Sequence, residues 1–164
     1  MFNLVRADLS KDTHSVALVE LLDLYARDLM GGGVALSDYT RQNLPAELHG
    51  RSGCHVVLAF SGEIPAGIAI NFEAFSTFAC RPILNIHDFM IAPMFRGQGL
   101  AKQLLEEIEI IARELGCCKL TLEVLEGNER AKKIYKRFGF DGYELDPAAG
   151  RALFFDKKLS LENR

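Results

Sequence analysis

The sequence predicts a mixed α/β (α+β) protein with a mostly antiparallel seven-stranded sheet, a central parallel β-α-β crossover and helices on both faces. Two apolar, β-branched runs joined by the turn residues 61–63 predict an antiparallel hairpin. Between residues 83 and 125, a strand pattern, an amphipathic helix pattern and a second strand pattern follow one another, which predicts a right-handed parallel crossover. The chain has 164 residues and a mass of 18.2 kDa, so we expect a single domain over residues 1–164.

The expected elements follow the order β-α-α-β-β-β-α-β-α-β-β. Alternating or continuous apolar runs predict strands at residues 2–6, 55–60, 64–72, 83–91, 118–124, 143–145 and 152–159. Helical spacing of apolar residues, with capping Asp, Ser or Asn and terminating glycines, predicts helices at residues 12–30, 37–48, 100–115 and 129–138. Residues 75–78 either extend the third strand or form a loop.

The helix patterns also indicate which faces are buried. In the third predicted helix the charged residues fall on the side opposite the apolar ones, so one face should pack on the sheet. Its apolar positions are Leu100, Leu104, Leu105, Ile108, Ile111, Ala112 and Leu115. In the first predicted helix the apolar positions at helical spacing are Val16, Val19, Leu22, Tyr25, Ala26 and Leu29.

Composition and charge exclude several classes of protein. Apolar residues make up 49% of the chain and charged residues 25%, which is typical of a globular protein and not of a disordered one. The formal charge of −3 argues against nucleic acid as the main partner. No apolar run approaches the roughly 20 residues that span a bilayer, and the start does not resemble a signal peptide. We therefore expect a soluble, cytoplasmic protein with no membrane partner.

Cysteine and histidine spacing gives no support to a metal site. The four cysteines form no C-x-x-C pair, and the four histidines form no H-x-x-x-H pair. We expect no metal, and four reduced cysteines that act as small apolar residues.

The run Arg96-Gly97-Gln98-Gly99-Leu100-Ala101 lies between a predicted strand and the strongest predicted helix. Its glycines let the backbone turn tightly, and the free N–H groups of the turn and of the helix start form a concave donor surface that favours phosphate. Alone, such a loop is equally a plain turn. It matches neither the dinucleotide-binding pattern G-x-G-x-x-G nor the P-loop pattern.

A longer stretch resembles a known family. Residues 86–101, with the order strand, R/Q-x-x-G-x-G/A and long helix, are similar to the core signature of the GCN5-related N-acetyltransferase (GNAT) superfamily. A second run resembles the family's L-E-V…N-x-x-A-x-x-x-Y-x-x-x-G-F pattern through Leu122-Glu123-Val124, Asn128, Ala131, Tyr135 and Gly139-Phe140. The resemblance is strong from about residue 84 to 143, and the first 80 residues match only in the order of their elements.

The resemblance implies direct acetyl transfer from acetyl-CoA, the co-substrate, to a primary amine of a small molecule or peptide. It implies a bulge at Phe89, Met90 and Ile91 whose backbone pairs with the pantetheine arm. The implied pyrophosphate site consists of the amides of Gly97, Gln98, Gly99, Leu100 and Ala101. Arg96 and Lys102 would add positive charge there, although Lys102 fits a solvated surface lysine equally well. Asn128 would contact the cofactor arm, cap a helix, or do both.

The same resemblance implies the catalytic groups. Tyr135 matches the tyrosine that protonates the leaving thiolate, and its alternative role is that of a helix-face aromatic. Glu123, His87, Asp88 and a water relay remain alternatives for the general base. Acceptor contacts are expected from residues 30–44, including Gly31–Gly33 and Tyr39, and from Phe75–Phe78. Glu73 and Asp88 are candidates to hold a cationic amine.

Two other functions stay open on the sequence. One is a non-catalytic acyl-CoA-binding sensor of the same fold, and the other is a different anion-binding α/β domain, for example for nucleotides. A homodimer formed through an edge strand is also compatible with the pattern.

Overall fold

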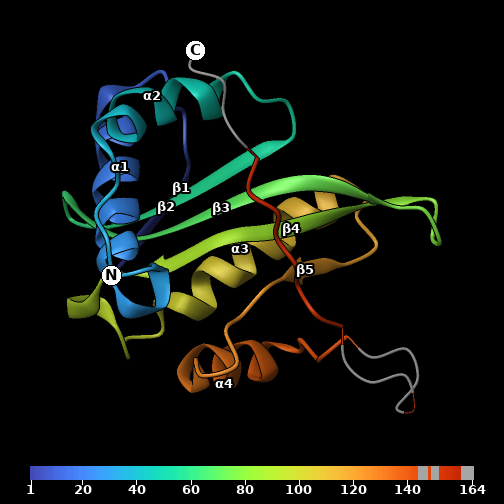
Figure 1. The fold of residues 1–164 in the computed structure, drawn as a ribbon. Helices are drawn as coiled ribbons and strands as arrows, with labels where there is room; N and C mark the ends of the chain where they lie inside the picture. The colour runs from blue at the N-terminus through green and yellow to red at the C-terminus, as the bar shows by residue number, and fades with distance from the viewer. Residues whose placement is uncertain (144–147, 149–151, 160–164) are drawn as a thin grey trace.

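The computed structural model describes residues 1–143, 148 and 152–159 of the chain. Its strands are β1 (Asn3–Arg6), β2 (Cys54–Ser61), β3 (Ile64–Ser76), β4 (Arg81–Ile91) and β5 (Leu120–Leu122). Its helices are α1 (Asp12–Arg27), α2 (Asp38–His49), α3 (Leu100–Glu114) and α4 (Glu129–Phe138), with short 3₁₀ turns at Leu29–Gly31 and Pro93–Phe95. Figure 1 shows how these elements follow one another along the chain.

The five strands form one sheet in the order β1-β2-β3-β4-β5. Strands β1 to β4 are antiparallel neighbours, whereas β4 and β5 are parallel. A tight turn is enough to connect an antiparallel pair, but a parallel pair needs the long connection that α3 provides. The predicted mixed sheet and its parallel crossover are therefore confirmed.

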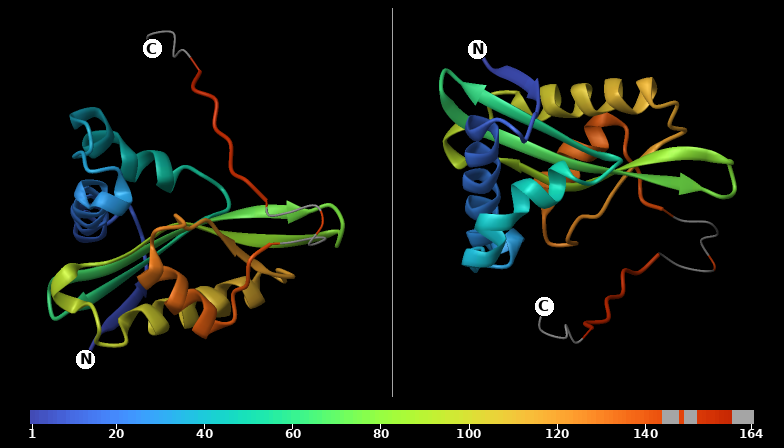
Figure 2. Two further views of the ribbon diagram at one scale, coloured as in Figure 1. Left: turned by 60° about the horizontal axis from the view of Figure 1, so that its bottom comes forward. Right: turned by 90° about the horizontal axis from the view of Figure 1, so that it is seen from above.

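The helices cover both faces of the sheet. Figure 2 shows α1 and α2 on one face and α3 and α4 on the other. Helix α1 contacts β2, β3 and β4, and α3 contacts the same three strands from the opposite side. The predicted placement of helices on both faces of the sheet is confirmed, and the apolar core lies between the sheet and the two helical layers.

The sheet has five strands in the described part of the chain, and not the seven that we predict from the sequence. The strand predicted at residues 152–159 is wrong, because these residues form no strand and Leu153, Phe154 and Phe155 are exposed. Apolar, β-branched and aromatic residues fit a strand only where a neighbouring strand pairs with them, and the local pattern names no neighbour.

The other predicted strands near the C-terminus differ as well. Tyr143 lies in no strand, and residues 144 and 145 of the strand predicted at 143–145 lie outside the described residues. The strand predicted at 118–124 forms only at Leu120–Leu122. Its three residues pair with Leu84, Asn85 and Ile86 of β4.

Helix α1 ends at Arg27, three residues before its predicted end. Asp28 has an extended backbone, and its carboxylate accepts a hydrogen bond from the Met30 N–H (2.9 Å), so a separate 3₁₀ turn starts here. The carboxylate therefore satisfies a donor that would otherwise need the helix to continue.

The buried face of α1 is rotated from the predicted one. Leu18 and Leu21 are buried against the sheet, whereas Val16 and Leu29 are exposed. In α3 the predicted face is confirmed, and its buried residues are Leu100, Leu104, Leu105, Ile108, Ile111 and Ala112. The α1 pattern is ambiguous because apolar residues occur around more of that helix than its buried stripe.

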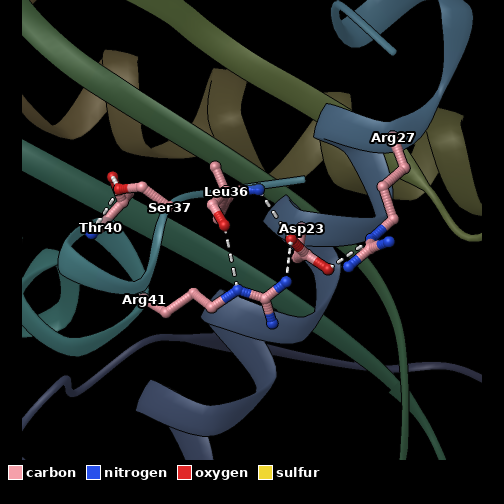
Figure 3. A network of polar contacts seen from close by, with 6 residues as sticks. All are labelled: Asp23, Arg27, Leu36, Ser37, Thr40 and Arg41. Carbon is pink, nitrogen blue, oxygen red and sulfur yellow. Dashed lines mark hydrogen bonds and ion pairs between the residues drawn. The ribbon is translucent and has the colours of Figure 1, made fainter. Parts of the chain in front are cut away.

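A polar network fixes the connection between α1 and α2 (Figure 3). The Asp23 carboxylate accepts hydrogen bonds from the Leu36 N–H (2.9 Å), from Arg41 Nη2 (2.7 Å) and from Arg27 Nε (2.8 Å). Arg41 Nε also donates to the Leu36 carbonyl (3.2 Å). These bonds lower the pKa of Asp23, with the Arg27 bond as the main cause. One carboxylate thus holds both helices and the segment between them.

Two local features shape the same connection. Ser37 caps α2, since its hydroxyl accepts a hydrogen bond from the Thr40 N–H (3.1 Å). At Gly31 an added Cβ would lie 1.9 Å from the carbonyl oxygen of Tyr25, so only glycine allows this close approach of the loop to the end of α1.

Candidate active site

Strand β4 contains an extra residue near the point where the sheet divides. Ile70 of β3 lies opposite Asp88, whereas the next residue, Asn71, lies opposite Ile86, so His87 has no partner in this register. This is a β-bulge, which bends a strand and changes the direction of its side chains. The bulge lies at His87 and not at residues 89–91, because those residues keep regular pairing with β3.

The other edge of β4 is open beyond this bulge. Strand β5 pairs with residues 84–86 only, and no other described strand pairs with β4 on that side. Figure 1 shows the chain leaving β5 and turning toward α4, away from the end of β4. The backbone of residues 87–91 is therefore available to pair with an extended ligand.

The glycine loop leads directly into α3. Gly97 (φ 81°) and Gly99 (φ 83°) adopt left-handed conformations that glycine tolerates and other residues rarely do. Among the described residues no side chain caps α3, and the N–H of Gln103 is bonded to the Gly99 carbonyl (3.4 Å). The N–H groups of residues 100–102 precede that bond, so the helix start presents free donors to a ligand.

The open edge of β4, the glycine loop and α4 enclose one cleft of about 1040 Å³. All the residues predicted to bind the cofactor line it except Gln98, whose side-chain amide donates to the Met94 carbonyl (3.0 Å). The predicted cofactor residues along the cleft are Phe89, Met90, Ile91, Arg96, Gly97, Gly99, Leu100, Ala101, Lys102, Asn128 and Tyr135.

Arg96 is bound to protein groups. Its Nε donates to the Ile91 carbonyl (3.0 Å), and its Nη2 donates to the Asp28 carboxylate (3.1 Å). The Met30 N–H bond and then the Arg96 bond lower the pKa of Asp28. Arg96 therefore joins the end of β4 to the end of α1, and it brings these two sides of the cleft together.

Tyr135 lies on α4 with its ring between two other aromatic rings. The ring centroids of Phe89 and Phe140 are 5.9 Å and 5.8 Å away, both in edge-to-face geometry. Burial, with Tyr25 nearby, raises the pKa of Tyr135 to about 12. The phenol is thus protonated throughout the neutral range and lies in the cleft. Asn128 caps α4 through the Ala131 N–H (3.1 Å) and also lines the cleft.

The three candidate bases lie at or next to the cleft. Glu123 follows β5, is exposed and lines the cleft. His87 at the bulge also lines it and is exposed, with its ring 5.4 Å from that of Phe72. Asp88 is half-buried, and burial raises its pKa while His87 offsets part of that effect.

Sequence reasoning missed the contribution of α1 to the cleft. Tyr25, Asp28 and Met30 line it, and burial, with the charges of Asp88 and Asp28, raises the pKa of Tyr25. Only Met30 lies within the segment predicted to contact an acceptor. No spacing in the sequence relates these residues to the glycine loop, about 70 positions further on.

The other predicted acceptor residues lie elsewhere. Gly31–Gly33, Tyr39, Phe75–Phe78 and Glu73 do not line the cleft. Residues 75–78 lie at the turn between β3 and β4, which projects from the sheet (Figure 1). Glu73 is bonded to His55 (2.8 Å).

Basic residues of α4 form a further part of the cleft wall that the sequence analysis missed. Arg130, Lys133 and Arg137 line the cleft, as does Lys102 at the start of α3. Their signal in the sequence is an i, i+3, i+7 spacing, which places them on one side of a helix.

The structure gives no indication of a metal centre or a membrane span. Over the described ranges, no cluster of three or more His, Cys, Asp or Glu side chains is placed to bind a metal ion, and the four cysteines are free. No helix in that part of the chain has the length and apolar character needed to cross a bilayer.

These features define an α/β protein whose sheet opens beside a helix start with free N–H donors. The family model of the Acetyltransferase (GNAT) family matches residues 18–140, and the chain belongs to this family. A solved structure, AAC(6')-Iy in complex with the bisubstrate analogue CoA-S-monomethyl-acetylneamine, has the same fold, with a TM-score of 0.76 and 17% sequence identity. That likeness covers 97% of this chain and 99% of the other.

Curated relatives match a smaller part of the chain. The thialysine N-epsilon-acetyltransferase of Caenorhabditis elegans is 34% identical over 104 residues, which are 58% of this chain and 64% of that protein. The protein of the same name from Bos taurus is 32% identical over 78 residues, 48% of this chain and 45% of the relative. The chain thus matches between about half and two thirds of the length of these relatives.

Proposed function

We propose that the protein is an N-acetyltransferase that moves an acetyl group from acetyl-CoA directly to a primary amine of a small molecule or peptide. The observation that supports this most is the open edge of β4 beside the free amides at the start of α3. The family and the names of the relatives, which are N-acetyltransferases, agree with it.

The residues of the cleft fit acetyl-CoA, which supplies the acetyl thioester. Apart from the Ile91 carbonyl, which accepts a bond from Arg96, the backbone of residues 87–91 has no described partner strand on this side and can bind the amides of the pantetheine arm. The N–H groups of Leu100, Ala101 and Lys102, with the positive end of the α3 dipole, would hold the pyrophosphate. Ala101 leaves room for the ligand to approach the helix because its side chain is a single methyl group.

Tyr135 would assist the departure of the thiolate. Its pKa of about 12 exceeds the roughly 8.5 of a thiol by about 3.5, which corresponds to about 5 kcal/mol against complete proton transfer. The phenol therefore acts as a hydrogen-bond donor that stabilises the leaving thiolate, and it keeps its own proton as the C–S bond breaks. The nitrogen of the acceptor forms the new C–N bond and loses a proton to a base.

The acceptor that suits this cleft best is a cationic amine. Glu123 lines it, and Asp88 lies beside it close enough to affect Tyr25. Carboxylates attract an ammonium group, and a base among them can remove its proton before attack. The relatives named for thialysine and the neighbour named for an acetylneamine analogue agree with an amine acceptor. The base remains a choice among Glu123, His87, Asp88 and water.

Turnover and ligand binding of the Tyr135→Phe variant test this function. A panel of amines is screened for acetyl-CoA-dependent thiol release, and acetyl-CoA affinity is measured by isothermal titration. We expect kcat to fall by about 100-fold or more while the Kd for acetyl-CoA changes less than about 3-fold. The matched control is Tyr143→Phe, since Tyr143 is exposed and lies outside the cleft.

The outcomes separate the competing functions. Full turnover by Tyr135→Phe would exclude the proposed role of the phenol. Acetyl-CoA binding without transfer to any amine of the panel would favour a non-catalytic sensor. Binding of ATP in place of acetyl-CoA would favour a different nucleotide-binding function. Because the pKa of Tyr135 is about 12, activity should not decline through loss of its proton below about pH 11.

A further inference from the structure

Helix α4 is strongly basic in a chain that is acidic as a whole. Its residues 129–138 include five cations (Arg130, Lys132, Lys133, Lys136 and Arg137) and one anion (Glu129), whereas the whole chain has a formal charge of −3. Like charges repel along a helix, so this concentration lowers the stability of α4 unless an anion binds beside it.

The five cations divide into two sets. Lys132 is paired with Glu129, and neither Lys132 nor Lys136 lines the cleft. Arg130, Lys133 and Arg137 line the cleft, and their side chains form no ion pair or hydrogen bond with any residue that the structure describes. The hydrogen bond from Lys132 is the main cause that lowers the pKa of Glu129, and the charge of Lys133 adds to it, so one of the three cations has a nearby acidic neighbour.

The start of α3 adds another cation to the same cleft. Lys102 lines it from the first turn of α3, and its ammonium also lies 3.4 Å from Glu106 in an exposed pair. Two helices thus present basic side chains to one cavity, close to the amides that are free to bind a diphosphate. The amide loop already suits a diphosphate, so the three unpaired cations of α4 remain for a second phosphate group.

We propose that Arg130, Lys133 and Arg137 bind the 3′-phosphate of the donor's adenosine and make the protein select coenzyme A over its 3′-dephosphorylated form. This inference rests on the proposed function, because it assigns a subsite for the same donor. A phosphate monoester has a charge between about −1.5 and −2 at pH 7 and offers three strong acceptor oxygens. One guanidinium group can bind two of these oxygens at once, and a lysine ammonium adds a single positive charge.

Titrations with CoA and dephospho-CoA test the assignment, since these ligands differ only in the 3′-phosphate. For the wild-type protein we expect dephospho-CoA to bind about 10-fold or more weakly than CoA. In the triple variant Arg130→Gln, Lys133→Gln, Arg137→Gln, the Kd for CoA should rise to that for dephospho-CoA. The Kd for dephospho-CoA should stay within about 3-fold of the wild-type value.

The matched control is the double variant Lys132→Gln, Lys136→Gln, which removes positive charge from the same helix outside the cleft. It should keep the wild-type ratio between the two Kd values, because general attraction acts on both ligands. Circular dichroism and the unfolding midpoint of each variant show whether α4 remains folded.

The possible results are distinct. Equal affinity of the wild-type protein for CoA and dephospho-CoA would overturn the inference and leave the acetyl-CoA site intact. An equal loss of affinity for CoA and dephospho-CoA in the triple variant would also overturn it. The cations would then bind the diphosphate or attract both ligands through their overall positive charge. If neither ligand binds the wild-type protein, the proposed function itself fails.

Discussion

The ion pair between Asp28 and Arg96 joins the end of α1 to the loop that precedes α3, and replacing Asp28 tests whether this link stabilises the cleft. Asp28→Asn keeps the size of the side chain and an oxygen that can accept the Met30 N–H bond, but it removes the charge that faces Arg96. Arg96 keeps its bond to the Ile91 carbonyl (3.0 Å). The substitution therefore isolates the electrostatic part of the contact.

The expected change in the free energy of unfolding follows from how exposed the two side chains are. The side chains of Arg96 and Asp28 are 32% and 29% exposed, so the pair is neither solvated nor fully buried. Exposed pairs contribute about 0.2–1 kcal/mol, and breaking a buried pair costs about 3–5 kcal/mol. We expect Asp28→Asn to lower the free energy of unfolding by about 1–1.5 kcal/mol.

Urea unfolding of the wild type, Asp28→Asn, Arg96→Gln and the double variant gives the coupling energy of the pair. We expect a coupling of about 1 kcal/mol at pH 7. The pKa of Asp28 is lowered in the folded state, so this stability is present above the unfolded pKa near 3.9 and is lost as the pH falls through the lower folded pKa. Glu109→Gln, which breaks an exposed pair with Arg113 on α3, is the control. A coupling below about 0.3 kcal/mol at pH 7 would refute the expected stabilisation of the cleft by this pair.

Two further substitutions test the core and the α1–α2 connection. Leu104→Ala removes a fully buried side chain of α3 and should lower the free energy of unfolding by about 3 kcal/mol. Ile110→Ala, on the exposed face of the same helix, should lower it by less than about 1 kcal/mol. Equal effects of the two variants in urea unfolding would contradict this packing. Asp23→Ala removes one hydrogen bond from a backbone N–H and two from arginine side chains, and it should lower the free energy of unfolding by about 2 kcal/mol in the same measurement. Glu47→Ala, which removes an exposed ion pair, should have almost no effect. If Asp23→Ala lowers the free energy of unfolding by less than about 0.5 kcal/mol, the network does not stabilise the protein as expected.

The parts of the fold that sequence reasoning predicted are those that local patterns determine. In α3 the apolar residues recur at helical spacing and charged residues fill the other face, so Leu104 and Ile108 could be assigned to the core without any partner being known. Gly97 and Gly99 lie at positive φ where the loop turns, and this requirement is visible in the residue type itself. The parallel crossover followed from the order of elements, because its handedness and connection are restricted.

The predictions that failed concern features that depend on which segments of the chain meet in the fold. The segment 152–159 has the right residues but pairs with no strand in the described part of the chain, and the exposure of Phe154 and Phe155 reflects that missing pairing. The bulge lies at His87 because the register with β3 changes there, and register is a property of two strands. In α1 the contact with β3 decides that Leu18 is buried and Val16 is exposed.

The same distinction applies to the candidate site, because one part is specified by a local motif and the other depends on which segments meet. A diphosphate is bound by consecutive amides of one loop and the helix that follows, so a short motif can specify it. The proposed acceptor side combines Tyr25 of α1 and Asp28 just after it with Glu123 after β5, and these residues line one cleft only because the sheet brings both faces to one opening. Arg96 belongs to both sides, since it extends the phosphate motif and binds the carboxylate at the end of α1. A change at Asp28 should therefore affect the KM for the amine more than the Kd for acetyl-CoA, because the amide donors at the start of α3 do not depend on that carboxylate.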